Sequence, residues 1–117
     1  MAVATLLLVD DDEMSSQILS YILVEEGYEV DMATTGASAI EKSAKKVYDL
    51  VLLDYILPDL KGQEVARRMK TQRPEMKIIL LTGYTNEGNP TDPNYVRVML
   101  KPVPPDVIVR TIADLLH

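Results

Sequence analysis

Short apolar runs that alternate with helical patterns are the feature that most limits how this chain can fold. Residues 6–9, 50–53 and 78–81 are apolar without interruption, and residues 96–100 form a fourth run that only Arg97 interrupts. A strand that is apolar on both faces is typical of a parallel sheet covered by helices on both sides. The alternation therefore predicts an α/β fold with right-handed crossovers.

Apolar residues between the runs recur at the spacing of a helix. Four helices are predicted in this way: after the first run, beyond a cap at Thr34 or Thr35, after Gly62, and from Pro105 onward. The predicted apolar stripes are Met14, Ile18, Tyr21 and Ile22 in the first helix; Ala37, Ile40, Ala44 and Val47 in the second; Val65, Ala66 and Met69 in the third; and Ile108, Ile112, Leu115 and Leu116 in the last.

Residues 28–32 alternate apolar and acidic side chains, as a half-exposed strand at the edge of a sheet does. Together with the four runs they give five parallel strands. A flavodoxin-like, doubly wound sheet with the order 2-1-3-4-5 places this strand at an edge. Because no linker or repeat interrupts the pattern, residues 1–117 are predicted to form one domain.

The composition excludes several classes of function. The 117 residues contain no cysteine, which excludes disulfides, thiolate metal sites and a cysteine nucleophile. A net charge of -6 argues against direct binding of nucleic acid, since phosphates repel an acidic surface. The apolar start of the chain lacks the basic region of a signal peptide and is too short to span a membrane. We therefore expect a cytoplasmic protein without a membrane segment.

Charged or hydroxyl side chains follow the apolar runs of the predicted sheet. Asp10 and Asp11 follow the first run, Asp54 the second, Thr82 the third and Lys101 the fourth. In doubly wound sheets the carboxyl ends of the strands meet at one edge, where ligands bind. Crowded carboxylates raise one another's pKa values unless a cation compensates them, and Mg²⁺ prefers such oxygen ligands. The sequence therefore predicts a Mg²⁺ site at this edge.

Each of these residues also has a simpler explanation when it is considered alone. Asp11 or Asp12 can cap the following helix, and Asp54 can belong to a turn. Thr82 can bond to its own backbone, and Lys101 can be an ordinary solvated side chain. A single shared site explains their joint placement better than five separate coincidences do.

Four segments, in this order, resemble those of the receiver domain of bacterial two-component response regulators. The segments are Leu7-Leu8-Val9-Asp10-Asp11; Val51-Leu52-Leu53-Asp54 with Leu57-Pro58 and Gly62; Leu81-Thr82-Gly83; and Lys101-Pro102. The resemblance covers essentially the whole chain, and the combination is specific although no single segment is. It implies a CheY-like fold and a receiver domain over residues 1–117.

The resemblance implies that Asp54 is the phosphoacceptor. It would take the phosphoryl group from a phosphohistidine of a sensor histidine kinase or a histidine phosphotransfer protein. The resemblance assigns Mg²⁺ to Asp11, Asp54 and the backbone carbonyl of Ile56, with Asp10 orienting a coordinated water. The domain would catalyse only its own phosphorylation and dephosphorylation, so it would be a signalling domain and not a separate enzyme.

The resemblance also implies how the phosphoryl group would act as a signal. Lys101 would pair with its oxygens, and the Thr82 hydroxyl would hydrogen-bond one of them and carry the conformational change. This change would switch contacts with an unknown downstream protein or a covalently linked output domain. The chain would accordingly be either a stand-alone receiver or part of a longer regulator or hybrid kinase.

The stretch between the last two predicted strands departs from the family pattern. Residues 83–95 contain two Gly, two Pro and three Asn, which disfavour a stable helix. We expect the family's fourth helix to be shortened or replaced by a loop. The family usually has an aromatic switch residue three positions before the lysine, where this chain has Val98, so Tyr84 or Tyr95 would have to substitute.

Two bulky residues predict a long-lived phosphorylated state. Ile56 and Tyr84 occupy the positions that, in this family, tune hydrolysis of the acyl phosphate. A large side chain there obstructs the attacking water. We therefore expect slower loss of the phosphoryl group than in receivers with polar residues at these positions.

The alternatives to a phosphoacceptor are a phosphatase, an FMN carrier and a pseudo-receiver. A haloacid dehalogenase-type phosphatase also begins with a nucleophilic aspartate, but its motif ends in Thr or Val where this chain has Met14. A flavodoxin-like FMN carrier needs Gly, Ser and Thr after the first strand to bind phosphate, and this chain has consecutive acids there. A pseudo-receiver, which binds proteins without phosphorylation, commonly lacks an acid or the lysine that this chain retains.

Overall fold

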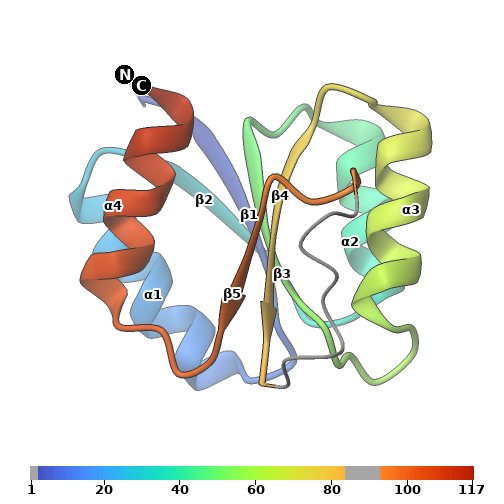
Figure 1. Ribbon diagram of the computed structural model, residues 1–117, viewed down its shortest axis with the longest axis horizontal. Coiled ribbons are helices and arrows are strands. Elements are labelled where there is room, and N and C mark those ends of the chain that lie inside the picture. The colour runs from blue at the N-terminus through green and yellow to red at the C-terminus, as the bar shows by residue number, and fades with distance from the viewer. Residues whose placement is uncertain (1–2, 84–92) are drawn as a thin grey trace.

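The computed structural model describes residues 3–83 and 93–117, in which strands and helices alternate along the chain (Figure 1). The elements in chain order are β1 (Thr5–Val9), α1 (Glu13–Glu25), β2 (Glu29–Ala33), α2 (Gly36–Lys45), β3 (Leu50–Asp54), α3 (Gly62–Gln72), β4 (Lys77–Thr82), β5 (Arg97–Leu100) and α4 (Pro105–Leu116). All five predicted strands and all four predicted helices are present, with ends that differ by a few residues.

The strands form one parallel sheet in the order β2-β1-β3-β4-β5. Helices α1 and α4 cover one face of the sheet, and α2 and α3 cover the other (Figure 1). Strand β2 lies at an edge, as its alternating side chains predicted. The prediction of a flavodoxin-like, doubly wound α/β fold is therefore confirmed.

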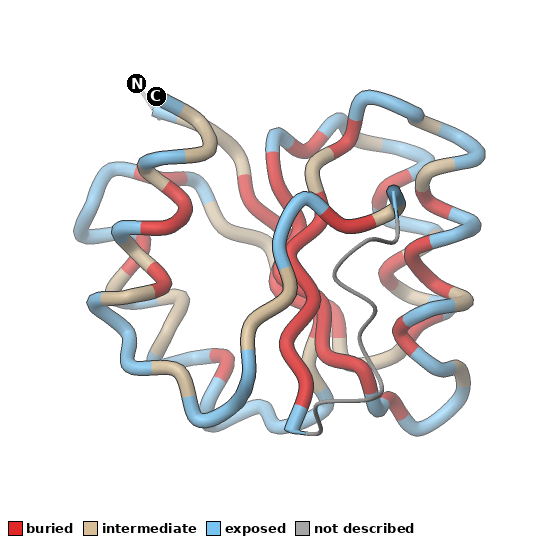
Figure 2. Tube along the Cα trace, in the orientation of Figure 1, coloured by how far each residue is buried: buried red, intermediate tan, exposed pale blue. Residues whose placement is uncertain are grey.

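The core consists of two apolar layers, one on each face of the sheet. Successive strand side chains point to opposite faces, so Leu7 and Val51 belong to one layer while Leu6 and Leu50 belong to the other. Figure 2 shows the buried strands running through the middle of the molecule. Because helices cover both faces, β1, β3 and β4 are buried along nearly their whole length, which explains their uninterrupted apolar runs.

Helix α1 turns a different side toward the sheet from the one predicted. Met14, Ile18 and Tyr21 are 73%, 57% and 69% exposed. The buried residues of α1 are Ser16 and Leu23. The prediction is wrong because α1 is apolar on two sides, and helical spacing alone does not identify which side packs on the sheet.

Helix α2 also buries a different side, and the reason is close packing. The exposed members of the predicted stripe are Ala37, Ala44 and Val47. The small residues Gly36 and Ala39 are buried in their place. A Cβ atom on Gly36 would lie 2.7 Å from Cγ2 of Val65, so α2 approaches α3 as closely as only glycine permits.

The stripes predicted for the third and the last helix are confirmed. Val65, Ala66 and Met69 of α3 are fully buried. Ile108 and Ile112 of α4 are buried as well, and Leu115 and Leu116 pack against them at the edge of the same apolar layer. Within the described ranges, no helix combines the length and the apolar character needed to cross a membrane.

The prediction of a shortened or missing fourth helix falls largely on residues 84–92, which lie outside the described residues, as does the prediction for Tyr84. The described part of the same connection, residue 83 and residues 93–96, contains no helix. Tyr95 is buried in the apolar layer beneath α2 and α3.

The loop between β3 and α3, which we call the β3–α3 loop, is tightly closed. The backbone N–H of Gly62 donates to the carbonyl of Tyr55 at 2.6 Å, and Ile56 pairs with Lys61 in an isolated antiparallel bridge. A Cβ atom on Gly62 would lie 2.6 Å from the backbone oxygen of Asp54. Glycine is therefore required at this position for the loop to fold back onto the end of β3.

Asp59 ties the β3–α3 loop to the first turn of α2. Its two carboxylate oxygens accept hydrogen bonds from the backbone N–H groups of Gly36 (2.8 Å) and Ala37 (2.9 Å). The N–H of Ala37, followed by that of Gly36, holds the pKa of Asp59 below its ordinary value. The loop that follows Asp54 is thus anchored at both of its ends and at its tip.

Replacing Asp59 with asparagine should lower the free energy of unfolding at neutral pH, because an amide offers one acceptor oxygen in place of two. The folded-state pKa of Asp59 lies below its unfolded value. Its carboxylate therefore stabilises the fold above the unfolded pKa, and this stabilisation is lost as the pH falls through the folded pKa. Urea unfolding at about pH 7 and about pH 3 should show that the difference between the two proteins narrows in acid. An equal difference at both pH values would contradict this role of the charge.

Candidate functional site

The predicted site residues meet at the carboxyl edge of the sheet. Asp10 and Asp11 follow β1, Asp54 and Thr82 end β3 and β4, and Lys101 follows β5. The strand register places Asp54 opposite Leu81 and places Thr82 opposite Leu100, so these ends are level with one another. The parallel sheet therefore gathers residues that lie far apart in the sequence.

Three of these side chains form a compact carboxylate cluster. Asp10, Asp11 and Asp54 each offer an oxygen, and the three oxygens lie within 4.8 Å of one another. Asp54 is buried, Asp10 is half-buried and Asp11 is exposed. Lys101 Nζ lies 2.9 Å from Asp54 Oδ1 in a salt bridge whose carboxylate side chain is only 11% exposed. One ammonium group thus faces three carboxylates.

The electrostatics of the cluster favour a divalent cation. Burial raises the pKa of Asp10 above its ordinary value, and the charges of Asp54 and Asp11 raise it further. The backbone N–H of Asp12, which donates to Asp10 Oδ1 at 3.0 Å, and the charge of Lys101 act in the opposite direction. Hard carboxylate oxygens at this spacing match the ligands that Mg²⁺ prefers. The residues present therefore fit the predicted ion.

Asp12 caps helix α1, which distinguishes it from its two acidic neighbours. Its carboxylate accepts hydrogen bonds from the backbone N–H of Ser15 (3.3 Å) and from the Ser15 hydroxyl (2.9 Å), and it is the N-cap of α1. These bonds, the one from the hydroxyl first, hold the pKa of Asp12 below its ordinary value. The capping explanation considered for the acidic run thus applies to Asp12, while Asp10 and Asp11 face Asp54.

Thr82 and Ile56 lie beside the cluster in different environments. Thr82 is almost fully buried, and its backbone carbonyl accepts the N–H of Lys101 at 2.8 Å. Ile56 is 58% exposed in the β3–α3 loop, two residues beyond Asp54. Both residues lie at the carboxyl edge of the sheet, Thr82 at the end of β4 and Ile56 two residues after β3, while the functional roles expected for them stay predictions.

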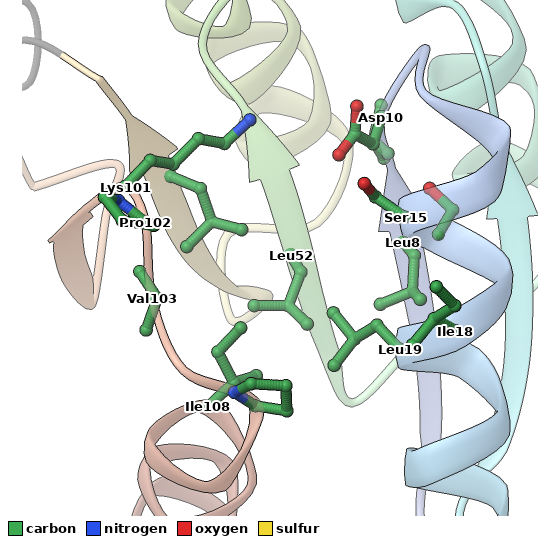
Figure 3. Close-up of a pocket in the computed structure, with 14 residues that line it drawn as sticks. Leu8, Asp10, Ser15, Ile18, Leu19, Leu52, Lys101, Pro102, Val103 and Ile108 are labelled. Atoms are coloured by element: carbon green, nitrogen blue, oxygen red, sulfur yellow. The ribbon is translucent and has the colours of Figure 1, made fainter.

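Sequence patterns did not indicate a cavity that opens beside the cluster. It lies between α1 and α4 over the ends of β1, β3 and β4 and has a volume of about 570 Å³ (Figure 3). We call it the α1–α4 cavity. Leu19, Leu52 and Ile108 line it, and Asp10 and Lys101 stand at the end nearest the carboxylate cluster. No local pattern marks such a cavity, because it depends on the separation of two helices.

Comparison with curated proteins gives relatives over nearly the whole chain. The family model of the response regulator receiver domain matches residues 6–113. The transcriptional regulatory protein ZraR of Klebsiella oxytoca is 31% identical over 114 residues, which make up 95% of this chain and 26% of ZraR. The chain spans about a quarter to a third of the length of the first curated relatives that it matches.

Solved structures show the same fold. A CheY-like response regulator receiver domain protein from Methanospirillum hungatei superposes with a TM-score of 0.92 at 32% identity, covering 98% of this chain and 94% of that one. The response regulator protein TrrA of Thermotoga maritima, in complex with Mg(2+)-BeF, gives a TM-score of 0.87 at 32% identity, covering 97% of this chain and 99% of TrrA. The resemblance noted in the sequence is therefore confirmed: this chain belongs to the response regulator receiver domain family.

Proposed function

We propose that this receiver domain accepts a phosphoryl group on Asp54 from a phosphohistidine and thereby switches its contacts with other proteins. The observation that carries the proposal is the salt bridge of 2.9 Å between Lys101 and Asp54 beside two further carboxylates. Phosphoryl transfer needs alignment and neutralisation of negative charge more than it needs covalent chemistry from the protein. An acceptor carboxylate flanked by an ammonium group and by ligands for a divalent cation meets both needs.

Asp11 and Asp54 would hold Mg²⁺ directly, together with the backbone carbonyl of Ile56. Asp10 would orient a water bound to the ion. Mg²⁺, when bound, neutralises charge on the transferring phosphoryl oxygens. The hydrogen bond from Gly62 to Tyr55 closes the β3–α3 loop and fixes the backbone around Ile56 relative to Asp54. This supports the assignment of the Ile56 carbonyl as a ligand. The complex of TrrA with Mg(2+)-BeF supports the same choice of ion.

In the proposed step, a carboxylate oxygen of Asp54 attacks the phosphorus of the donor. The bond between phosphorus and the imidazole nitrogen breaks, and the imidazole leaves with that electron pair. Lys101 then pairs with a phosphoryl oxygen, and the Thr82 hydroxyl hydrogen-bonds another. Because the backbone N–H of Lys101 donates to the carbonyl of Thr82, a movement at either residue is passed to the other. Hydrolysis of the aspartyl phosphate returns the domain to its resting state.

The exposed stripe of α1 supports a protein as the donor. Met14, Ile18 and Tyr21 lie at helical spacing and present apolar surface to solvent. Helix α1 begins at Glu13, two residues after Asp11, so a protein that brings a histidine to Asp54 comes close to this stripe as well. We assign the stripe to docking of a sensor histidine kinase or a histidine phosphotransfer protein.

The output is proposed to be a protein contact. The recipient is either a downstream protein or a covalently linked output domain, since ZraR extends well beyond the region matched by this chain. The acidic net charge of -6 argues against direct contact with nucleic acid or an anionic membrane surface. The proposed location is the cytoplasm, where histidine kinases phosphorylate such domains.

Incubation with acetyl phosphate and Mg²⁺ should add one phosphoryl group to the chain. Intact-mass spectrometry should show that the addition requires Mg²⁺ and disappears in Asp54→Asn, which keeps the shape of the side chain but removes the nucleophilic carboxylate. Asp114→Asn, on the exposed side of α4, is the matched control and should be phosphorylated normally. A folded wild-type protein that gains no mass would overturn the proposal and would favour a pseudo-receiver that binds proteins without phosphorylation.

Replacing Ile56 with asparagine should shorten the lifetime of the phosphorylated state severalfold, because a smaller polar side chain admits and orients the attacking water. Loss of the added mass with time, after removal of acetyl phosphate, gives the rate. The control Val47→Asn also replaces an exposed, branched apolar residue with asparagine, between α2 and β3, and it should not alter the rate. A wild-type half-life of seconds, or equal rates in all three proteins, would contradict the obstruction by Ile56.

A further inference from the structure

The α1–α4 cavity has mainly apolar walls. Its volume of about 570 Å³ lies within the range of small-molecule sites, roughly 300 to 1,000 Å³. No aromatic side chain is among the described residues that line the cavity, so none fills the space. Aliphatic residues of moderate size, such as Leu19, Val103 and Ile108, form the walls (Figure 3). The cavity therefore has apolar surface that a bound ligand would remove from water.

One polar atom in the wall lacks a partner. Ser16, which lines the cavity, is only 5% exposed. Its Oγ is the one buried side-chain nitrogen or oxygen, among the described residues, that has no hydrogen bond in the structure. A buried hydroxyl without a partner is unfavourable. Among the described residues, Ser16 is thus the point in the cavity wall where a buried polar side-chain atom is left unsatisfied.

The charged residues at one end of the cavity determine the charge of the ligand that it binds. Asp10 and Lys101 stand on opposite sides of that end (Figure 3). The ammonium of Lys101 already pairs with Asp54, whereas Asp10 faces two more carboxylates within 4.8 Å. The excess of negative charge repels an anionic ligand and attracts a cationic one.

We infer that the α1–α4 cavity binds a small amphipathic cation, with its apolar body between α1 and α4 and its ammonium or amidinium group at Asp10. Such a ligand would also compete with Mg²⁺, because its charge lies at the edge of the carboxylate cluster. The competition rests on the metal site proposed above, but binding in the cavity does not.

Phenylbutylammonium is a suitable probe. Phenylbutanol and phenylbutyrate are analogues of similar size that are neutral and anionic, and they serve as comparisons. Titration of the metal-free protein, followed by amide proton-nitrogen correlation NMR, should move resonances of α1 and of residues 101–108. The alcohol should bind about fivefold more weakly, and the carboxylate more weakly still. Shifts that are absent, or that scatter over the surface, would overturn the inference. Equal affinity for the alcohol would overturn the selectivity for a cation.

Val103→Phe should fill the cavity and reduce the affinity at least about tenfold. The control Val107→Phe makes the same replacement at a residue of α4 that does not line the cavity. This variant should bind the probe with the affinity of the wild type. If Val103→Phe does not fold, Val103→Leu provides a smaller filling and should still weaken binding. Unchanged affinity in folded Val103→Phe would place the probe elsewhere and overturn the inference.

Mg²⁺ separates this inference from the proposed function. The titration contains no phosphodonor, so binding of the probe is independent of whether Asp54 accepts a phosphoryl group. In Mg²⁺ at a concentration where the Asp54 amide resonance no longer moves, the affinity for the probe should fall severalfold. An unchanged affinity under that condition would contradict the placement of the ammonium group at Asp10.

Discussion

Three carboxylates repel one another at one edge of a buried sheet, and the surrounding elements have to hold them there against this repulsion. Asp10, Asp11 and Asp54 present oxygens within 4.8 Å of one another, and Lys101 bonds to only one of these residues. Such crowding persists only where the backbone holds the side chains in place and a cation compensates their charge. Strands β1 and β3 provide the first condition, because they are neighbours buried on both faces.

The two faces of the sheet support this edge differently. On one face, Gly36 lets α2 pack closely against α3, and Asp59 bonds the β3–α3 loop to α2. This packing fixes the segment that directly follows Asp54. On the other face, α1 and α4 leave an open cavity that reaches Asp10 and Lys101. The site thus has one closely packed wall and one wall that a ligand or a partner can reach.

Much of this arrangement could be predicted because strand burial and strand order act through the backbone. Uninterrupted apolar runs identified the central strands, and the carboxyl-end rule brought Asp54 and Lys101 together from opposite halves of the chain. The inward side of α1 could not be predicted, since the helix is apolar on two sides. The inward side of α2 depends on a close approach at Gly36, and the α1–α4 cavity depends on the distance between two helices. Local sequence patterns encode neither of these. From the sequence, the roles of Thr82 and Ile56 could be expected only on the family pattern.

In the proposed switch, the carboxylate cluster, Mg²⁺ and Lys101 together hold a phosphoryl group on Asp54. Fluorine NMR of the protein with fluoroberyllate, a stable mimic of that group, detects this complex. We predict bound fluorine resonances that appear only with Mg²⁺ and are absent in Asp54→Asn, together with a shift of the Lys101 amide. A folded wild-type protein that shows no bound fluoroberyllate in saturating Mg²⁺ would contradict the proposed role of Asp54 as the phosphoacceptor.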